Sequence, residues 1–147
     1  MEFDIAKILW TLDLMPPENL PQVATELLTE GFDCEALRLL AGLTSIEGAD
    51  VSNLFEQAMR ELGVPPLSKR EAVIGYTRLI SDEILQGKIA PYDGAKKIWN
   101  VSIKLDTPLH EVDPFIYAAS EFEDRPKDRD YFTSEIVKEA RQWGGKS

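Results

Sequence analysis

The sequence predicts an all-α protein in which about seven or eight short helices form one irregular bundle over residues 1–147. Three observations indicate this fold. Apolar residues recur with the spacing of a helix face, glycines follow these apolar segments where helices commonly end, and capping side chains precede several of them. Because the segments that connect the helices are short, we expect a single domain.

Glycines and capping residues mark the expected helix ends. Helices are expected to close at Gly31, Gly42, Gly63, Gly87 and Gly144. The expected N-caps are Asp33, Asp50, Ser68 and either Thr133 or Ser134. Together these signals place helices at residues 2–13, 19–30, 34–41, 51–62, 69–86, 92–105, 113–123 and 134–143.

Two of these segments have a clear apolar face. Within residues 69–86 the face consists of Val73, Tyr76, Ile80 and Ile84. Around residues 113–123 it consists of Val112, Phe115, Ile116, Ala119 and Phe122. We expect both faces in the core. Trp10 and Trp99 are expected there as well, whereas Trp143, close to the C-terminus, is expected to be partly exposed.

Residues 97–105 fit two kinds of secondary structure. Ile98, Trp99 and Ser102 belong to a helical stripe, whereas Val101 and Ile103 alternate with polar residues as in a strand. We favour a helix because no partner strand is visible. Several segments share the order helix, glycine, short loop and helix, which is typical of helical repeats. Since the period is not kept, we expect an irregular bundle instead.

The composition is that of a folded globular chain. Hydrophobic residues make up 44% of the 147 residues and charged residues 29%, which is too apolar for a disordered protein. No apolar run approaches the length that spans a membrane, and the acidic start is unlike a secretory signal. A single cysteine, Cys34, excludes an internal disulfide and suits a reducing compartment. We therefore expect a cytoplasmic location.

The formal net charge of −10 bears on the choice of partner. It repels the phosphate backbone of nucleic acids and favours a basic protein. The charge is also uneven: residues 1–63 hold 12 acidic and 3 basic residues, residues 64–105 hold 4 and 7, and residues 106–147 hold 10 and 6. The positive middle segment, flanked by negative ones, makes self-association a second option.

The segment EFEDRPKDRDYF, residues 121–132, combines five acidic residues, three cations and three aromatic rings. We expect it to be a hydrated loop between two helices. Aromatic rings within an acidic rim suit docking against a basic protein surface. The predicted partner-binding residues are Glu121, Glu123, Asp124, Asp128, Asp130, Tyr131 and Phe132. A purely structural alternative remains open, in which Phe122 and Phe132 belong to the core and fix the ends of the loop.

The same segment is a poor candidate for a metal site. A twelve-residue calcium loop that began at Asp124 would place Pro126 at a ligand position and Arg129 where a glycine makes the turn. The single histidine, His110, offers too few nitrogen ligands for structural zinc. The common phosphate-binding, dinucleotide-binding and hydrolase motifs are absent from the sequence. No catalytic residue, metal or cofactor is therefore expected.

These observations favour a small, acidic, non-enzymatic protein-binding module. Its most specific form is an immunity or antitoxin-like protein that masks a basic partner, because neutralising a basic protein calls for an acidic body with aromatic anchors. The alternative is a small helical, metal-assisted hydrolase that uses carboxylates within residues 111–130. Sequence crowding alone does not make a catalytic carboxylate pair, since one carboxyl must be desolvated and the other kept charged.

Overall fold

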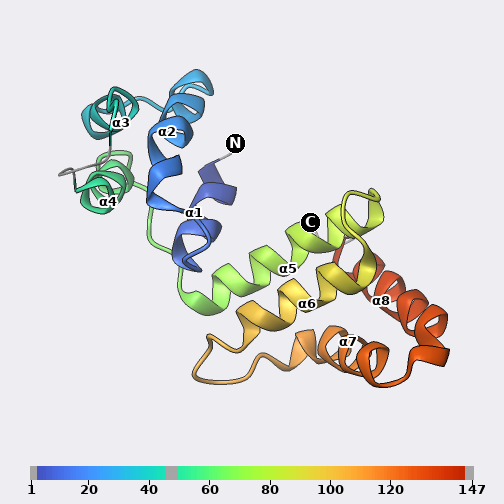
Figure 1. Ribbon diagram of the computed structural model, residues 1–147. Coiled ribbons are helices and arrows are strands. Elements are labelled where there is room, and N and C mark those ends of the chain that lie inside the picture. The colour runs from blue at the N-terminus through green and yellow to red at the C-terminus, as the bar shows by residue number, and fades with distance from the viewer. Residues whose placement is uncertain (1–2, 46–49, 145–147) are drawn as a thin grey trace. The chain divides into compact units, whose positions relative to one another are not determined.

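The structure is a computed structural model that describes residues 3–45 and 50–144 (Figure 1). In these residues eight α-helices and three short 3-10 helices follow one another, and the described chain contains no strand. The prediction of an all-α protein with seven or eight short helices is therefore confirmed. No helix in the described ranges has both the length and the apolar character needed to cross a membrane.

The described chain forms two compact units, one within residues 1–68 and the other within residues 69–147. The first unit contains α1 (Phe3–Thr11), η1 (Pro17–Asn19), α2 (Leu20–Thr29), α3 (Glu35–Ala41) and α4 (Val51–Glu61). The second contains α5 (Lys69–Leu85), α6 (Pro91–Ser102), η2 (His110–Val112), α7 (Asp113–Asp124), η3 (Pro126–Asp128) and α8 (Arg129–Gly144). A single domain over residues 1–147 stays a prediction.

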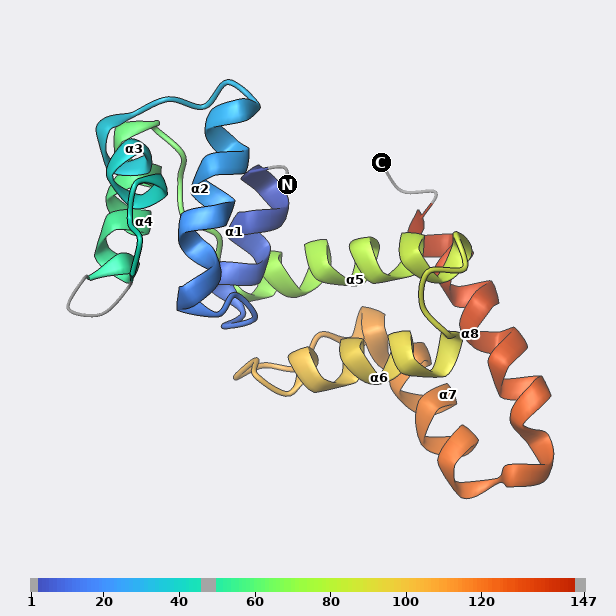
Figure 2. The same cartoon turned by 45° about the horizontal axis from the view of Figure 1, so that its top comes forward.

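The core of the first unit lies among its four α-helices. Both ribbon views show α1 beside α2 and α3 beside α4 (Figures 1 and 2). Leu27, Leu37 and Phe55 are completely buried and belong to one apolar cluster. The rings of Trp10 and Phe55 lie 5.3 Å apart, centroid to centroid. Burial of these apolar side chains is the main force that holds such short helices together.

In the second unit α5 and α7 each pack against both α6 and α8 (Figure 2). The predicted apolar face of α5 is buried throughout. In the second predicted face, Phe115 and Ala119 of α7 are buried, as is Val112 just before this helix. Phe122 and Ile116 are only half-buried. The predicted core face of α5 is therefore confirmed, and the face around α7 is confirmed except at Ile116 and Phe122, which are partly exposed.

Several predicted helix ends are confirmed. Gly31, Gly63 and Gly87 have φ angles of 101°, 70° and 74°, the left-handed conformation that closes a helix. The carboxylate of Asp50 accepts a hydrogen bond of 3.2 Å from the backbone N–H of Asn53 and so caps α4. The ambiguous segment is helical as far as Ser102, which confirms the choice of a helix over a strand.

Other expected ends differ in part. α3 ends at Ala41 with Gly42 as its C-cap, as expected, although Gly42 has a right-handed φ of −80°. Gly144 is the last residue of α8 rather than the residue beyond it. Cys34, not Asp33, occupies the N-cap of α3, because the Asp33 side chain instead pairs with Arg38 at 3.1 Å. Trp143 is only 5% exposed, contrary to expectation, because α8 packs against α5.

The largest error concerns residues 121–132. The expected loop is almost entirely helical, since α7 continues to Asp124 and α8 begins at Arg129 instead of residue 134. Pro126 starts the short η3 helix, where its fixed φ suits a first helical position and its missing N–H costs nothing. Thr133 and Ser134 therefore lie inside α8 and cap nothing. The charged segment is a tight corner between two helices.

Candidate functional site

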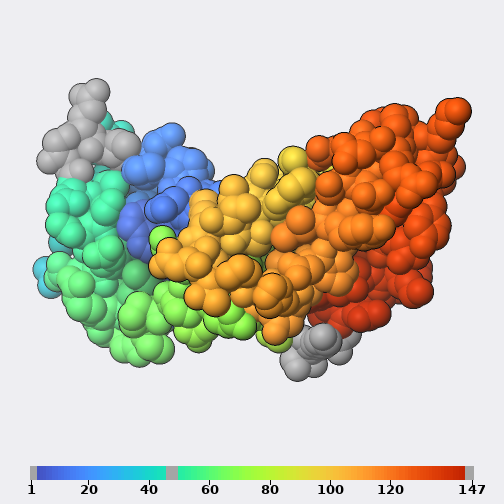
Figure 3. All heavy atoms as spheres, turned by 90° about the horizontal axis from the view of Figure 1, so that it is seen from below, coloured from blue at the N-terminus to red at the C-terminus, as the bar shows by residue number. Residues whose placement is uncertain are grey.

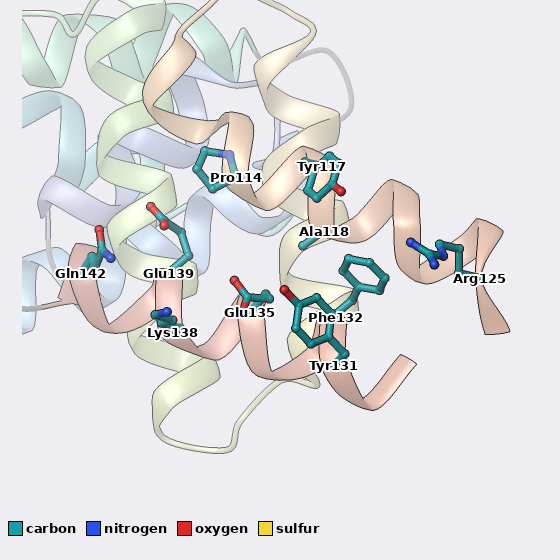
Figure 4. Close-up of a pocket in the computed structure, with 10 residues that line it drawn as sticks. All are labelled: Pro114, Tyr117, Ala118, Arg125, Tyr131, Phe132, Glu135, Lys138, Glu139 and Gln142. Carbon is teal, nitrogen blue, oxygen red and sulfur yellow. The ribbon is translucent and has the colours of Figure 1, made fainter. Parts of the chain in front are cut away.

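A groove between α7 and α8 is the candidate functional site (Figure 4). Its volume is about 450 Å³. One wall comes from α7, with Pro114, Tyr117 and Ala118. The other comes from α8, with an aromatic end at Tyr131 and Phe132 and a more polar end at Glu135, Lys138, Glu139 and Gln142. The volume is that of a small-ligand pocket, or of a groove for a few side chains of a partner.

Arg125 holds the corner that brings the two walls together. Its guanidinium lies 3.6 Å from the carboxylate of Glu121 and 3.1 Å from that of Asp128, which ties the end of α7 to the turn before α8. The same guanidinium lies 6.0 Å from the centre of the Phe132 ring. Arg125 is exposed and both carboxylates are only partly buried, so each ion pair contributes little to stability. Their combined effect is to fix the geometry of the corner.

The aromatic end of the groove combines one buried ring with two exposed ones. Phe132 is only 3% exposed, whereas Tyr117 is 63% exposed and Tyr131 is 60% exposed. Both tyrosines form edge-to-face pairs with the Phe132 ring, with centroid distances of 6.2 Å for Tyr117 and 5.0 Å for Tyr131. Figure 4 shows the three rings gathered at one end of the groove. Packing against Phe132 therefore orients both exposed tyrosines in advance.

The charged residues that line the groove are of both signs. Arg125 and Lys138 are cationic, and Glu135 and Glu139 are anionic. Glu139 accepts a hydrogen bond of 3.2 Å from the indole N–H of Trp143, so this carboxylate also has a structural contact. The groove itself is consequently not a strongly acidic surface. Its distinctive feature is the pair of exposed tyrosines.

Two of the seven predicted partner-binding residues line this groove, namely Tyr131 and Phe132. Phe132 is buried and supports the tyrosines, as the structural alternative for this residue anticipated. Tyr117 was missed because it lies on the preceding helix, outside the charged segment. A signal for it was present: within residues 113–123 it is the large aromatic residue that does not belong to the apolar face of the helix.

Glu123 lies on a different face, toward α6. Its carboxylate oxygen Oε2 accepts hydrogen bonds of 2.6 Å from the Tyr92 hydroxyl and 2.9 Å from the Lys96 ammonium. The Tyr92 ring also stacks on Phe122, with centroids 4.4 Å apart. In the space-filling view the atoms of α6 and α7 form a continuous surface (Figure 3). Glu123 thus links α6 to α7 and is not part of the groove.

The contacts of Glu123 also affect protonation. The hydrogen bond from Tyr92, followed by that from Lys96, lowers the pKa of the Glu123 carboxyl below its ordinary value. In return, the bond to Glu123 raises the pKa of the Tyr92 hydroxyl. Both directions favour a charged glutamate beside a protonated tyrosine, which is the state that keeps the link intact near neutral pH.

The remaining predicted acids do not form one surface. Glu121 and Asp128 pair with Arg125, as described above. Asp124 and Asp130 are exposed and make no ion pair among the described residues. The segment therefore distributes its charges over the corner, the α6 face and the groove. Sequence proximity did not translate into a single acidic rim.

No observation favours the metal-assisted alternative in the part of the chain that the structure describes. Within that part, no group of three or more His, Cys, Asp and Glu side chains lies close enough together to hold a metal ion. His110 pairs with Asp113 at 2.9 Å, and both side chains are exposed. The twelve residues that begin at Asp124, in the register of a calcium loop, span a helix end, a turn and the start of α8.

Fold and site together define an all-α protein with an exposed aromatic groove between two consecutive helices. Comparison of the chain with models of protein families, with curated proteins and with solved structures finds no match.

Proposed function

We propose that this chain is a non-enzymatic protein-binding module whose α7–α8 groove docks a more basic partner protein. The exposure of Tyr117 and Tyr131 against the buried Phe132 carries this proposal. Tyrosine supplies a large contact area and a polar hydroxyl at a low cost in side-chain entropy. Because both rings are already oriented, a partner would lose little additional free energy in ordering them.

The preference for a basic partner rests on charge. The chain carries a formal net charge of −10, and residues 106–147, which include the groove, hold 10 acidic and 6 basic residues. Such a field accelerates the approach of a positively charged protein and repels an acidic one. The charges that line the groove are mixed, so the field would steer the encounter while the tyrosines hold the complex. An immunity or antitoxin-like role in the cytoplasm is the most specific form of this proposal.

Affinity capture with matched variants tests the proposal. The immobilised full chain is exposed to lysate of the cells that produce it, at about 50 mM and about 500 mM salt, where exposed charges are screened to different extents. Wild type is compared with the double variant Tyr117→Ala/Tyr131→Ala. We expect wild type to retain a basic protein at low salt, and the double variant to retain much less of it.

Ile103→Ala is the matched control, because Ile103 is another exposed large apolar side chain of the same unit. It should retain as much partner as wild type. The proposal fails if the retained protein is acidic, or if the double variant captures it as well as wild type does. Retention of a second copy of the chain instead would show self-association rather than the masking of a basic protein.

A further inference from the structure

Independently of the α7–α8 groove, we propose that a small apolar pocket in residues 1–68 receives one large apolar side chain from a basic segment of a partner protein. The pocket is lined by three apolar residues, Phe3, Phe32 and Val64, and by two acidic ones, Asp4 and Glu30. Its volume is about 260 Å³. This volume is below that of ordinary small-ligand sites, about 300–1,000 Å³, and is sufficient for one large side chain.

The position of the pocket follows from the way two helices end. After α2, Gly31 takes a φ of 101° and the N–H of Phe32 donates a 3.1 Å hydrogen bond to the carbonyl of Leu27. After α4, Gly63 takes a φ of 70° and the N–H of Val64 donates a 2.9 Å bond to the carbonyl of Met59. Both are Schellman endings, which fix the residue after the glycine and turn its side chain toward apolar neighbours.

Phe32 is held in place yet left uncovered. Its ring forms an edge-to-face pair with Phe3 at a centroid distance of 5.1 Å, and the Phe3 ring in turn lies 6.3 Å from the ring of the buried Phe55. Phe3 is buried, whereas Phe32 remains 36% exposed. A rigid aromatic wall connected to the core is the kind of surface on which an inserted anchor residue gains most free energy.

Charge determines the kind of partner. Residues 1–68 hold 12 acidic and 3 basic residues, a net charge of −9, whereas residues 69–147 hold 14 and 13. Nearly all of the net negative charge of the chain therefore belongs to the unit that contains this pocket. Asp4 and Glu30 add carboxylates to the lining of the pocket itself. An apolar anchor flanked by lysine or arginine complements such a site, while an acidic segment would be repelled.

A defined peptide tests the inference. The probe is a synthetic peptide of about ten residues with lysines around one central phenylalanine, titrated into the isotope-labelled full chain and followed by NMR and calorimetry. We expect the amide signals of Phe32 and Val64 to shift. Replacing the phenylalanine of the peptide by alanine should weaken binding about tenfold, and replacing its lysines by glutamates should abolish it.

Variants of the chain form the second part of this binding experiment. Phe32→Ala should weaken binding about tenfold, whereas Leu39→Ala, at another exposed apolar residue of the same unit, should not change it. The alanine peptide involves no change in the protein, so the test holds even if Phe32→Ala unfolds. Equal affinity for the phenylalanine and alanine peptides would overturn the proposal that this pocket binds an apolar side chain. Signal changes confined to Tyr117 and Tyr131 would also overturn it, while leaving the proposed α7–α8 docking site intact.

Discussion

Glu123 shows at the scale of a single residue how the charged segment acts. Its pKa is lowered in the folded protein, so the contribution of the carboxylate to stability is present above the ordinary pKa of a glutamate and is lost as pH falls through the lowered value. We predict that the melting temperature of Glu123→Gln falls less than that of wild type between about pH 6 and about pH 3.

Asp124→Asn is the control for this pH series, because it removes the neighbouring carboxylate, which has no ion pair among the described residues. It should keep the wild-type dependence on pH. At alkaline pH the raised pKa of Tyr92 acts in the opposite direction. The contribution of the Tyr92 hydroxyl to stability is present below the ordinary tyrosine pKa and is lost as pH rises through the raised value. Superimposable profiles for wild type and Glu123→Gln would contradict the link between α6 and α7.

Gly94 is a residue at which packing outweighs helix propensity. A Cβ added there would lie 2.7 Å from Cδ1 and 2.8 Å from Cγ1 of Ile84 on α5. Replacing glycine by alanine inside a helix normally gains about 1 kcal/mol. Overpacking typically costs about 1–3 kcal/mol, so we predict that Gly94→Ala lowers the free energy of unfolding in a denaturant titration.

Gly42→Ala provides the comparison, since its added Cβ would lie at 3.4 Å from the nearest atom and φ is negative there. That variant should be as stable as wild type or more so. Adding Ile84→Val to Gly94→Ala should recover part of the loss, because it removes the closest atom. A gain of stability in Gly94→Ala alone would mean that α5 and α6 are farther apart than described.

Ser81 offers a gain of stability. Its side chain is completely buried within α5, and the hydroxyl has no hydrogen-bond partner among the described residues. The neighbouring buried hydroxyl, that of Thr77, donates a 2.7 Å bond to the carbonyl of Val73. Because an unpaired buried hydroxyl costs about 1–3 kcal/mol, Ser81→Ala should raise the melting temperature. A lower melting temperature would show that the hydroxyl is paired.

At the scale of the element, two carboxylates at the corner between α7 and α8 lie at opposite kinds of helix end. Asp130 lies in the first turn of α8, where the helix dipole favours a negative charge. Asp124 is the last residue of α7, where the helix dipole disfavours a negative charge. Asp130→Lys should lower the free energy of unfolding by about 0.3–1 kcal/mol, while Asp124→Lys should leave it unchanged or raise it. Equal effects of the two changes would argue against a helix that starts at Arg129.

The helices themselves could be predicted because each carries its own signal. The apolar face of α5, the capping carboxylate of Asp50 and the glycines that close α2 and α4 are all local, and the structure confirms them. The sequence does not reveal the start of α8, because the charge density of residues 121–132 is typical of a solvated loop. A helix corner is equally polar on its outer surface, and Pro126 was the local indication that a helical turn begins there.

The groove could be predicted only in part. Tyr131 and Phe132 were identified from one continuous segment, but the second wall comes from Tyr117, on another helix. Which exposed residues of two helices meet depends on how those helices pack, and a single sequence does not contain that information in a local pattern. Glu123 illustrates the converse, because its neighbours Tyr92 and Lys96 lie 31 and 27 residues away along the chain.

At the scale of the whole molecule, the net negative charge and the two exposed tyrosines of the groove lie in different units. The net charge of −9 belongs to residues 1–68, whereas the α7–α8 groove belongs to residues 69–147, where acidic and basic residues nearly balance. A basic partner would therefore be attracted chiefly by the first unit. The proposed pocket of Phe3, Phe32 and Val64 offers such a partner an apolar contact within that field.

The central claim is that oriented tyrosines on α7 and α8 hold a basic partner. Its most direct test is the dissociation constant of the purified, captured partner for wild type and for Tyr117→Ala/Tyr131→Ala, measured at low and at high salt. The account predicts at least about a tenfold loss of affinity in the double variant at both salt concentrations, and weaker binding of both proteins at high salt. Equal dissociation constants for wild type and the double variant would contradict it.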